Sequence, residues 1–152
     1  MKRTSHQAND CPIARSLDAI GDWWSLLIVR DALLGRSRFG EFQKSLGMAK
    51  NILSARLRGL TAFGILEAVP AADGSAHREY RLTPKGRDLY WVLVALRQWG
   101  DKYQFGEGEN PTLLVDRRDG RPVQPLELHA ADGRLLGPAD TLVVPAPERQ
   151  LS

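Results

Sequence analysis

The sequence predicts an α+β fold that is mainly α: a helix-rich body, one hairpin, a long helix and a small β appendage. Three observations support this. Apolar residues recur every three to four positions between residues 12 and 62, which indicates successive amphipathic helices. Residues 65–83 alternate instead around Asp73-Gly74, which indicates a β-hairpin. A second helical pattern then runs to Tyr103, and turn signals dominate after it.

Composition predicts one domain, or a small domain with an appendage. The 152 residues are 43% hydrophobic and 26% charged, enough for a core in an aqueous protein. No stretch approaches the roughly 18–20 apolar residues of a membrane span, and the polar start MKRTSHQAND lacks the apolar region of a signal peptide. With a single cysteine there is no internal disulfide framework, so we expect a cytoplasmic protein without membrane contact.

Three helices are predicted before residue 47. The first begins at Pro12, the second spans Trp23–Leu34 with Asp22 as N-cap, and the third begins at Ser37 or Arg38. Gly35 and Gly47 end the second and third helices. Their expected inward residues are Ile13, Leu17, Ile20, Trp24, Leu27, Ile28, Leu34, Phe39, Phe42 and Leu46.

The next predicted helix, Met48–Ala62, has two unlike faces. Two helices joined by a short turn, the second polar on its outer side, make a helix-turn-helix. A basic, polar outer face on such a helix is typical of DNA reading, although a solvated surface would have a similar charge. One face carries Ala49, Ile52, Leu53, Leu57 and Leu60; the other carries Asn51, Ser54, Ala55 and Arg58, with Lys50 at the margin.

The hairpin follows this helix directly. Its strands are predicted at Ile65–Val69 and Arg78–Thr83, with a loop over residues 71–76. A hairpin in that place is the wing of a winged helix-turn-helix. Thr83-Pro84 then starts a helix that continues to about Tyr103.

This last helix is apolar around most of its axis. Tyr90, Trp91, Val94 and Trp99 widen its apolar stripe, and a small domain cannot cover so much surface alone. We expect the same helix of a second copy to cover it in a two-fold dimer, with cover by the C-terminal tail as the alternative. The expected dimer interface consists of Leu89, Val92, Leu93, Leu96, Trp99 and Tyr103.

Residues 107–152 differ from residues 1–106, which form the expected DNA-binding and dimerisation domain. They contain six of the nine prolines and have turns at Asp119-Gly120 and Asp132-Gly133. Residues 1–105 carry 16 Lys and Arg against 10 Asp and Glu, whereas residues 106–152 carry 5 against 8. We expect an acidic β-rich extension away from DNA, disordered over Pro145–Ser152, with strands at Thr112–Asp116, Val123–Leu128, Leu135-Leu136 and Leu142–Val144.

Several blocks resemble one family. They are CPIARSLDAIGDWWSLLIVRDALLG, RFGEFQKSLG, KNILSARLRGL and REYRLTPKG, which together cover roughly residues 11–106. In this order they resemble the HxlR-type winged helix-turn-helix regulators, which are related to the MarR group. The resemblance implies a homodimeric bacterial transcription factor, a repressor or an activator, that binds double-stranded DNA at an imperfect inverted repeat.

The predicted DNA-contacting residues follow from side-chain chemistry. Lys50, Asn51 and Ser54 are expected to read bases, because Lys favours guanine, Asn pairs with adenine and Ser serves several bases. Solvated helix surface is the alternative for Asn51 and Ser54. His77 and Arg78 are expected on the wing. The expected phosphate contacts are Arg36, Arg38, Arg56 and Arg58, of which Arg56 projects nearer the apolar face.

Cys11 is a candidate thiol sensor. A helix start and Arg15 one turn on both favour the thiolate, whereas burial in a dimer interface would make it an inert structural thiol. In several members of the family that the chain resembles, a cysteine here senses oxidants or electrophiles. Without a second cysteine, an intersubunit disulfide between two different cysteines cannot form, so a sulfenic acid, a mixed disulfide or an alkylated thiol remains.

Catalysis is not expected. His6, His77 and His129 are dispersed, and no HExxH, CxxC, phosphate loop or nucleophile elbow is present, so we expect no metal or cofactor. The alternative function is a winged helix for protein contacts or ligand sensing. In that case a small aromatic effector could bind against Trp23, Trp91 or Trp99.

Overall fold

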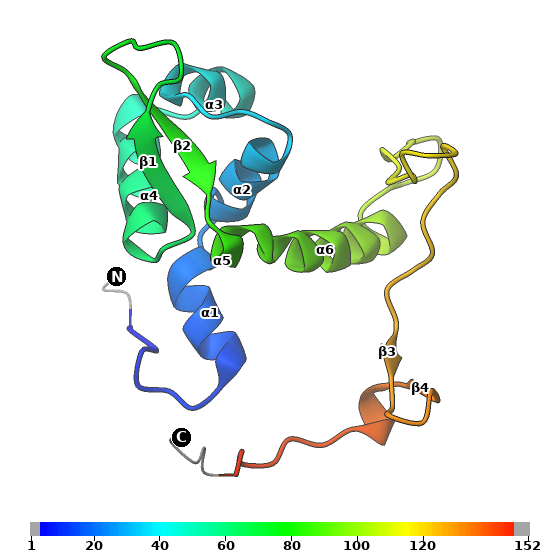
Figure 1. Cartoon of the computed structure of the whole chain (residues 1–152). Coiled ribbons are helices and arrows are strands. Elements are labelled where there is room, and N and C mark those ends of the chain that lie inside the picture. The colour runs from blue at the N-terminus through cyan, green and yellow to red at the C-terminus, as the bar shows by residue number, and fades with distance from the viewer. Residues whose placement is uncertain (1–3, 148–152) are drawn as a thin grey trace. The chain divides into compact units, whose positions relative to one another are not determined.

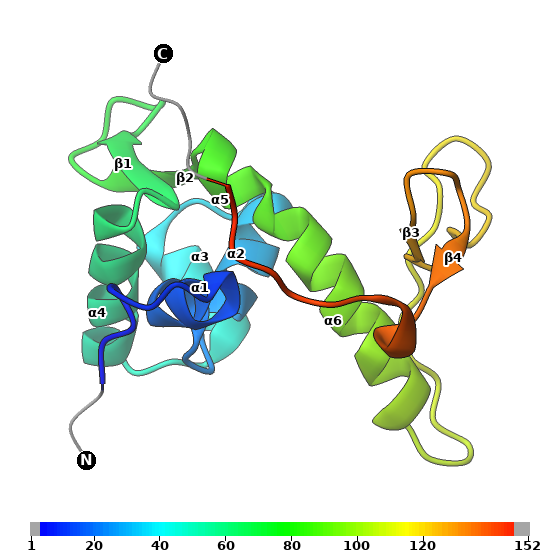
Figure 2. The same ribbon diagram turned by 90° about the horizontal axis from the view of Figure 1, so that it is seen from below.

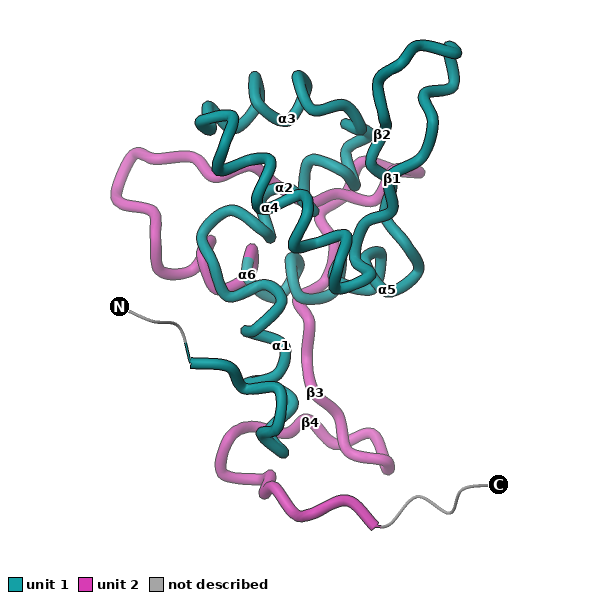
Figure 3. The backbone as a smooth tube through the Cα atoms, turned by 90° about the vertical axis from the view of Figure 1, so that its left-hand side faces the viewer, with its two compact units in different colours: residues 1–96 teal, residues 97–152 magenta. Residues whose placement is uncertain are grey.

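The computed structural model of the protein describes residues 4–147 and divides into two compact units, residues 1–96 and 97–152 (Figure 3). The division falls inside helix α6 (Leu89–Tyr103), earlier than the boundary at residue 106 that the sequence suggested. The last turns of α6 belong to the second unit because Arg97 and Gln98 hydrogen-bond to the segment that follows the helix.

The first unit begins with four helices connected by short turns (Figure 1). The second of them begins at Ser25 with Trp24 as N-cap, two residues later than predicted, and Asp22 Oδ1 accepts hydrogen bonds from the backbone N–H groups of Trp24 and Ser25 at 2.9 Å each just before it. Gly47 ends the third with a φ of +65°, a conformation that favours glycine. The helices are α1 (Pro12–Ile20), α2 (Ser25–Leu33), α3 (Phe39–Leu46) and α4 (Lys50–Ala62).

The predicted hairpin follows α4. Strand β1 (Leu66–Pro70) pairs antiparallel with β2 (Arg78–Leu82), with Leu66 opposite Leu82. The segment before α3 pairs with β2 over a very short stretch. The Tyr80 N–H donates to the Ser37 carbonyl oxygen at 2.7 Å, and Arg38 and Glu79 form an isolated antiparallel β-bridge. The wing is therefore joined by backbone hydrogen bonds to the start of the helix-turn-helix.

The core of the first unit lies between α2, α3, α4 and the start of β1. Leu53, Leu57 and Leu60 confirm the predicted inner face of α4, since each is at most 1% exposed. Ala49 and Ile52 were also expected there, but both are exposed, because Ala49 precedes the helix as its N-cap and Ile52 lies in its first turn. The remaining buried apolar cluster comprises Ile20, Ile28, Val29, Phe42, Met48, Ile65 and Leu66.

Three other predicted core positions are wrong. Ile13 and Leu17 are exposed, and only Ile20 of the predicted α1 stripe is buried, at the end of the helix next to the core. Leu34 is exposed because it follows the last turn of α2 as its C-cap. The chain by itself therefore leaves apolar surface on α1 and at the end of α2.

The long helix predicted from Thr83 is divided in two. The Oγ1 of Thr83 caps α5 (Pro84–Arg87) by accepting the Gly86 N–H at 3.1 Å, and Asp88 separates α5 from α6. The Trp91 N–H reaches the Asp88 carbonyl, three residues back, at 3.4 Å, so the chain tightens there. No residue of α6 is fully buried within the chain, and none of the helices between residues 4 and 147 is long and apolar enough to span a bilayer.

The second unit contains little regular structure. Strand β3 (Leu128–His129) pairs antiparallel with β4 (Leu135–Leu136), and a 3-10 helix, η1, spans Pro138–Asp140. Gly120 and Gly133 have positive φ values, as the predicted turns require.

Most of the strands predicted in this unit are absent. Residues 112–116 contribute only Val115, in a bridge with Pro122, and residues 123–127 and 142–144 form no strand, because no neighbouring ladder within the described chain pairs with them. Of the end predicted to be disordered, residues 148–152 lie outside the described residues.

Gly86 provides a test of this packing. A Cβ atom on Gly86 would lie 2.1 Å from the Ile65 carbonyl oxygen, which is backbone and cannot give way cheaply. We expect Gly86→Ala to lower the free energy of unfolding by roughly 1–3 kcal/mol, measured by urea denaturation. The matched control is Gly59→Ala in α4, where nothing lies within 4 Å and helix propensity should add up to about 1 kcal/mol. Equal effects of the two substitutions would contradict the assigned contact.

Candidate nucleic-acid interface

Helix α4 lies at the edge of the first unit in two perpendicular views (Figures 1 and 2). Its buried leucines fix the helix rotation, so the opposite side faces outward. On that side Lys50, Asn51 and Arg58 are exposed and Ser54 is half-buried. Residues 51, 54 and 58 lie on one face, because their spacing of three and four matches the helical period. The structure thus brings together the predicted base-reading residues and one predicted phosphate contact.

Arg38 lies between α3 and the wing. Its Nη2 donates a hydrogen bond to Asp73 Oδ2 in the wing loop, and the same nitrogen lies 3.6 Å from Glu79 Oε1. The Arg38 hydrogen bond, with further help from Ser75, holds the pKa of Asp73 far below its usual value. This predicted phosphate contact therefore also connects α3 to the wing, and we refer to the Arg38–Asp73 pair as the wing clamp.

Arg36 and Arg56 also have carboxylate partners. Arg36 Nη1 lies 3.6 Å from Asp31 Oδ1, and the fully buried Asp31 carboxylate also pairs with Arg30 at 3.1 Å. Arg56 Nε lies 3.2 Å from Asp22 Oδ1, which ties α4 to the start of α2.

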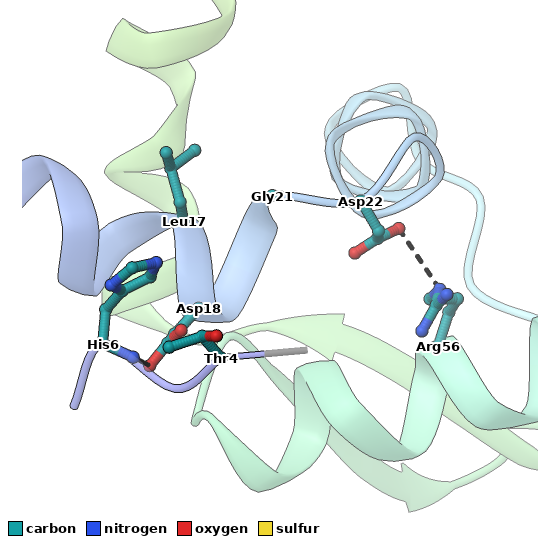
Figure 4. Close-up of a pocket in the computed structure, with 7 residues that line it drawn as sticks. All are labelled: Thr4, His6, Leu17, Asp18, Gly21, Asp22 and Arg56. Atoms are coloured by element: carbon teal, nitrogen blue, oxygen red, sulfur yellow. Dashed lines mark hydrogen bonds and ion pairs between the residues drawn. The ribbon is translucent and has the colours of Figure 1, made fainter. Parts of the chain in front are cut away.

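Figure 4 shows Arg56 directed at Asp22 beside a pocket that the N-terminal segment and α1 also line. Burial acts to raise the pKa of Asp22, but hydrogen bonds from Ser25 Oγ and two backbone N–H groups, together with Arg56, lower it overall. The wall of the pocket at Asp22 and Arg56 is therefore formed by an internal ion pair, although the buried Nε of Arg56 makes no hydrogen bond within the described chain.

Four cations near α4 and the wing have no carboxylate partner among residues 4–147: Lys44, Lys50, Arg58 and Arg78. Lys44 is a candidate that the sequence reasoning missed, although its place on the polar side of α3 was an available signal. A groove between the first turn of α3 and the wing is lined by Arg38, Phe39, Lys44, His77, Arg78 and Tyr80. Of the predicted wing residues, His77 immediately precedes β2 and Arg78 is its first residue, whereas Gly74 occupies the loop with a φ of +73°.

The predicted dimer residues fall into two groups. Leu89 and Leu93 pack against the core of their own chain, whereas Val92 and Leu96 are more than 40% exposed. In the second unit, Trp99 and Tyr103 are also exposed, and their ring centroids lie 5.6 Å apart. Much of the apolar surface of α6 is thus uncovered in the single chain.

Cys11 is exposed and is the N-cap of α1. Its backbone N–H donates to Asn9 Oδ1 at 2.9 Å, and Arg15 donates to the Asn9 carbonyl oxygen. The nearby cation therefore hydrogen-bonds to the backbone beside the thiol. Among the described residues, no group of three His, Cys, Asp or Glu side chains could hold a metal ion.

A helix-turn-helix with an outward polar second helix and an adjoining hairpin defines a winged helix-turn-helix protein. The HxlR-like helix-turn-helix family model matches residues 19–107, and the chain belongs to this family. The family and the named relatives are transcriptional regulators and not enzymes, so the recognition from sequence and the expectation of a non-enzyme are both confirmed.

Known proteins extend this assignment. The chain is 42% identical over 99 residues to an uncharacterized HTH-type transcriptional regulator of Mycobacterium tuberculosis, covering 65% of this chain and 63% of the relative. It is 58% identical to PA1607, a candidate transcription factor of known crystal structure, with a TM-score of 0.89 over 93% of this chain and 99% of that one. The reduced redox regulator HypR matches at 29% identity and a TM-score of 0.55, over 62% of this chain and 94% of its own.

The wing clamp can be tested by hydrogen exchange. Arg38→Gln removes the cation that holds Asp73, so amide exchange over residues 71–77 should rise about two- to fivefold, the range for a surface ion pair. Because the folded pKa of Asp73 is depressed, the clamp is fully ionised above the ordinary aspartate pKa and is lost only in strong acid. The increase should therefore be the same at pH 6 and pH 8.

The matched control for the clamp is Arg78→Gln, which removes a wing cation that has no carboxylate partner among the described residues. It should leave exchange over residues 71–77 unchanged. If Arg38→Gln has no more effect than Arg78→Gln, the clamp does not hold the wing.

Proposed function

We propose that the protein is a homodimeric transcriptional regulator that binds an inverted-repeat operator in double-stranded DNA. The observation that carries the proposal is the outward face of α4, where Lys50, Asn51, Ser54 and Arg58 have no polar partner among the described residues. Polar side chains that satisfy no internal group are free to bind an external one. The HTH-type regulators among the relatives support the same function.

In this proposal α4 enters the major groove. Lys50 and Asn51 lie in its first turn, the part of a recognition helix that contacts base edges in this motif. Asn51 would pair with adenine, Lys50 would favour guanine and Ser54 would add a less selective contact. Two such helices about 34 Å apart would match successive half-sites of an inverted repeat.

Phosphate contacts surround the base-reading residues. Arg58 and Lys44 are unpaired within the described chain, and Arg78 places a further cation on the wing. Arg36, Arg38 and Arg56 keep side-chain exposures of 38–40% despite their carboxylate partners. Because a guanidinium has five N–H donors, each can bind a phosphate with the donors that its carboxylate leaves free.

Dimerisation would use the uncovered surface of α6. Val92, Leu96, Trp99 and Tyr103 would face the second copy, while Leu89 and Leu93 fix the start of the helix on its own core. When α6 pairs with α6 of the second copy about a two-fold axis, one contact covers the apolar surface of both helices.

A small aromatic effector is a second element of the proposal. A groove in the first unit is lined by the rings of Tyr80, Tyr90 and Trp91 together with the cations Arg36, Arg81 and Arg87 and the carboxylate of Glu79. Aromatic rings beside an excess of guanidinium groups suit a planar anion. Since the groove touches both β2 and α6, its occupant would contact the wing and the dimerisation helix together.

Asn51→Ala tests base reading. The operator would first be selected from random duplex DNA with the purified full chain, and an inverted repeat is expected. Affinity for that site should then fall by about 1–3 kcal/mol in Asn51→Ala, because one bidentate base contact is lost. Fluorescence anisotropy at fixed salt would measure it, and affinity for random DNA should change little.

Arg58→Ala is the matched control, because it removes a phosphate contact from the same helix face. It should weaken operator and random DNA alike and reduce the salt dependence of binding. An Asn51→Ala variant that lost affinity equally for both DNAs would show that Asn51 reads no base. A wild-type chain that ignored duplex DNA at low salt would overturn the proposed function.

Oxidant sensing at Cys11 is a third element of the proposal, supported by the exposed thiol and by similarity to the redox regulator HypR. Peroxide or quinone treatment of the dimer should lower operator affinity at least several-fold in the wild type, because a modified thiol at the start of α1 would disturb that helix. Cys11→Ser should keep its affinity after the same treatment. Identical responses of the two proteins would remove Cys11 as a sensor.

A further inference from the structure

The C-terminal segment lacks a core of its own. None of the described residues from 107 to 147 is buried, and β3 and β4 are only two residues long. A two-stranded hairpin of this size is not stable alone in water. The segment must therefore be held by contacts beyond its own hairpin.

Hydrogen bonds to α6 fix the first part of the segment. Arg97 Nη1 donates to the carbonyl oxygen and Oγ1 of Thr112 at 3.0 and 2.8 Å. The Gln98 side chain pairs with the backbone of Leu126, donating to its carbonyl at 3.1 Å and accepting its N–H at 2.7 Å. The chain is thus attached to the helix up to Leu126.

We call residues 127–144, which follow this attachment, the arm. Its hydrogen bonds are local, such as the one from the Ala130 N–H to the Arg134 carbonyl at 2.8 Å. Its apolar side chains are nevertheless exposed, and Val143 is 99% exposed. Neighbouring apolar side chains left in water mark an interaction surface. The exposed set is Leu128, Leu135, Leu142, Val143 and Val144.

The charge of the arm points to a basic occupant. The arm contains Glu127, Asp132 and Asp140 against Arg134, whereas residues 1–105 carry an excess of six positive charges. A second copy of this chain supplies such a basic body. It also supplies uncovered apolar surface, because Ile13 and Leu17 of α1 and Val92 and Leu96 of α6 are exposed in the single chain.

The two solved structures match different shares of this chain. HypR matches only 62% of this chain, whereas the PA1607 crystal structure matches 93% with a TM-score of 0.89. The segment from residue 107 makes up almost a third of the chain, so the PA1607 match includes most of it. A segment without its own core therefore has a similar conformation in the crystal structure of a similar protein.

From these observations we propose that the arm of each copy packs on α1 and the first half of α6 of the second copy. Reciprocal exchange covers the apolar residues of both arms and both bodies, as two-fold symmetry requires. The inference rests on the homodimer of the proposed function and adds a second contact to the pairing of α6 helices.

Cross-linking between differently labelled copies tests the exchange. In a full-length Cys11→Ser background, Leu135→Cys would carry a maleimide photo-cross-linker, and light and heavy isotope-labelled copies would be mixed and allowed to exchange. Mass spectrometry should find cross-links from residue 135 to peptides of α1 or α6, about half of them joining light to heavy chains. Arg118→Cys, in the exposed turn before the arm, is the control and should give no such cross-links.

Two exposed leucines provide an independent comparison. Leu135 in the arm is 62% exposed and Leu113 before the arm is 65% exposed, so neither contributes to the core of its own chain. Leu135→Ser should raise the dimer dissociation constant about tenfold or more in sedimentation experiments, and Leu113→Ser should change it less than twofold.

The outcomes separate this inference from the proposed function. A stable dimer whose residue 135 cross-links only within its own copy, or not at all, would overturn the exchanged arm and leave the regulator intact. Equal dimer affinities for Leu135→Ser and Leu113→Ser would overturn it too. A wild-type chain that stays monomeric at micromolar concentration would overturn both the arm and the homodimer.

Discussion

The burial of three leucines on α4 is the contact on which the candidate interface depends. Leu53, Leu57 and Leu60 pack into the core with Ile28 and Phe42 and so fix the rotation of the helix about its axis. A rotation of half a turn would bury the polar side chains of the opposite face without partners, which is costly. The same apolar contacts that stabilise the fold therefore determine which side chains DNA would meet.

Ion pairs then hold the elements around α4 in position. Arg56 connects α4 to α2, and Arg38 connects the start of α3 to the wing. Pairs of this kind contribute little to global stability when exposed. Their effect is geometric, because they hold the helix and the wing in register while leaving guanidinium donors for phosphate. The predicted phosphate-binding cations are thus of two kinds. Some position structural elements through ion pairs, and others have no carboxylate partner among the described residues.

Local signals predicted the first unit well and the partners of its arginines not at all. Helical period, glycine turns and the Asp22 hydrogen bonds before α2 are encoded within a few residues, so α1–α4 and the wing were found within a few positions. Asp73 lies 35 positions from Arg38, and no local pattern links them. Leu17 and Leu34 were wrongly predicted to be buried in the core. Helical spacing shows that an apolar residue faces an apolar partner, but that partner can belong to another chain. The strands after residue 107 were overpredicted because alternation alone does not supply a neighbouring strand.

This last failure follows from the same cause as the apolar surface of α6. Both the helix and the segment after Gly106 contain apolar side chains at positions where the pattern predicts burial, yet neither finds enough cover within the described chain. Sequence patterns report the burial that a residue type favours, including burial by another molecule, whereas the single chain shows only the burial that it supplies itself. Where pattern and observed burial disagree in several separate elements at once, one contact with another molecule would explain all of them. Local misprediction would need a separate cause for each element, so the disagreement supports the second copy that we propose.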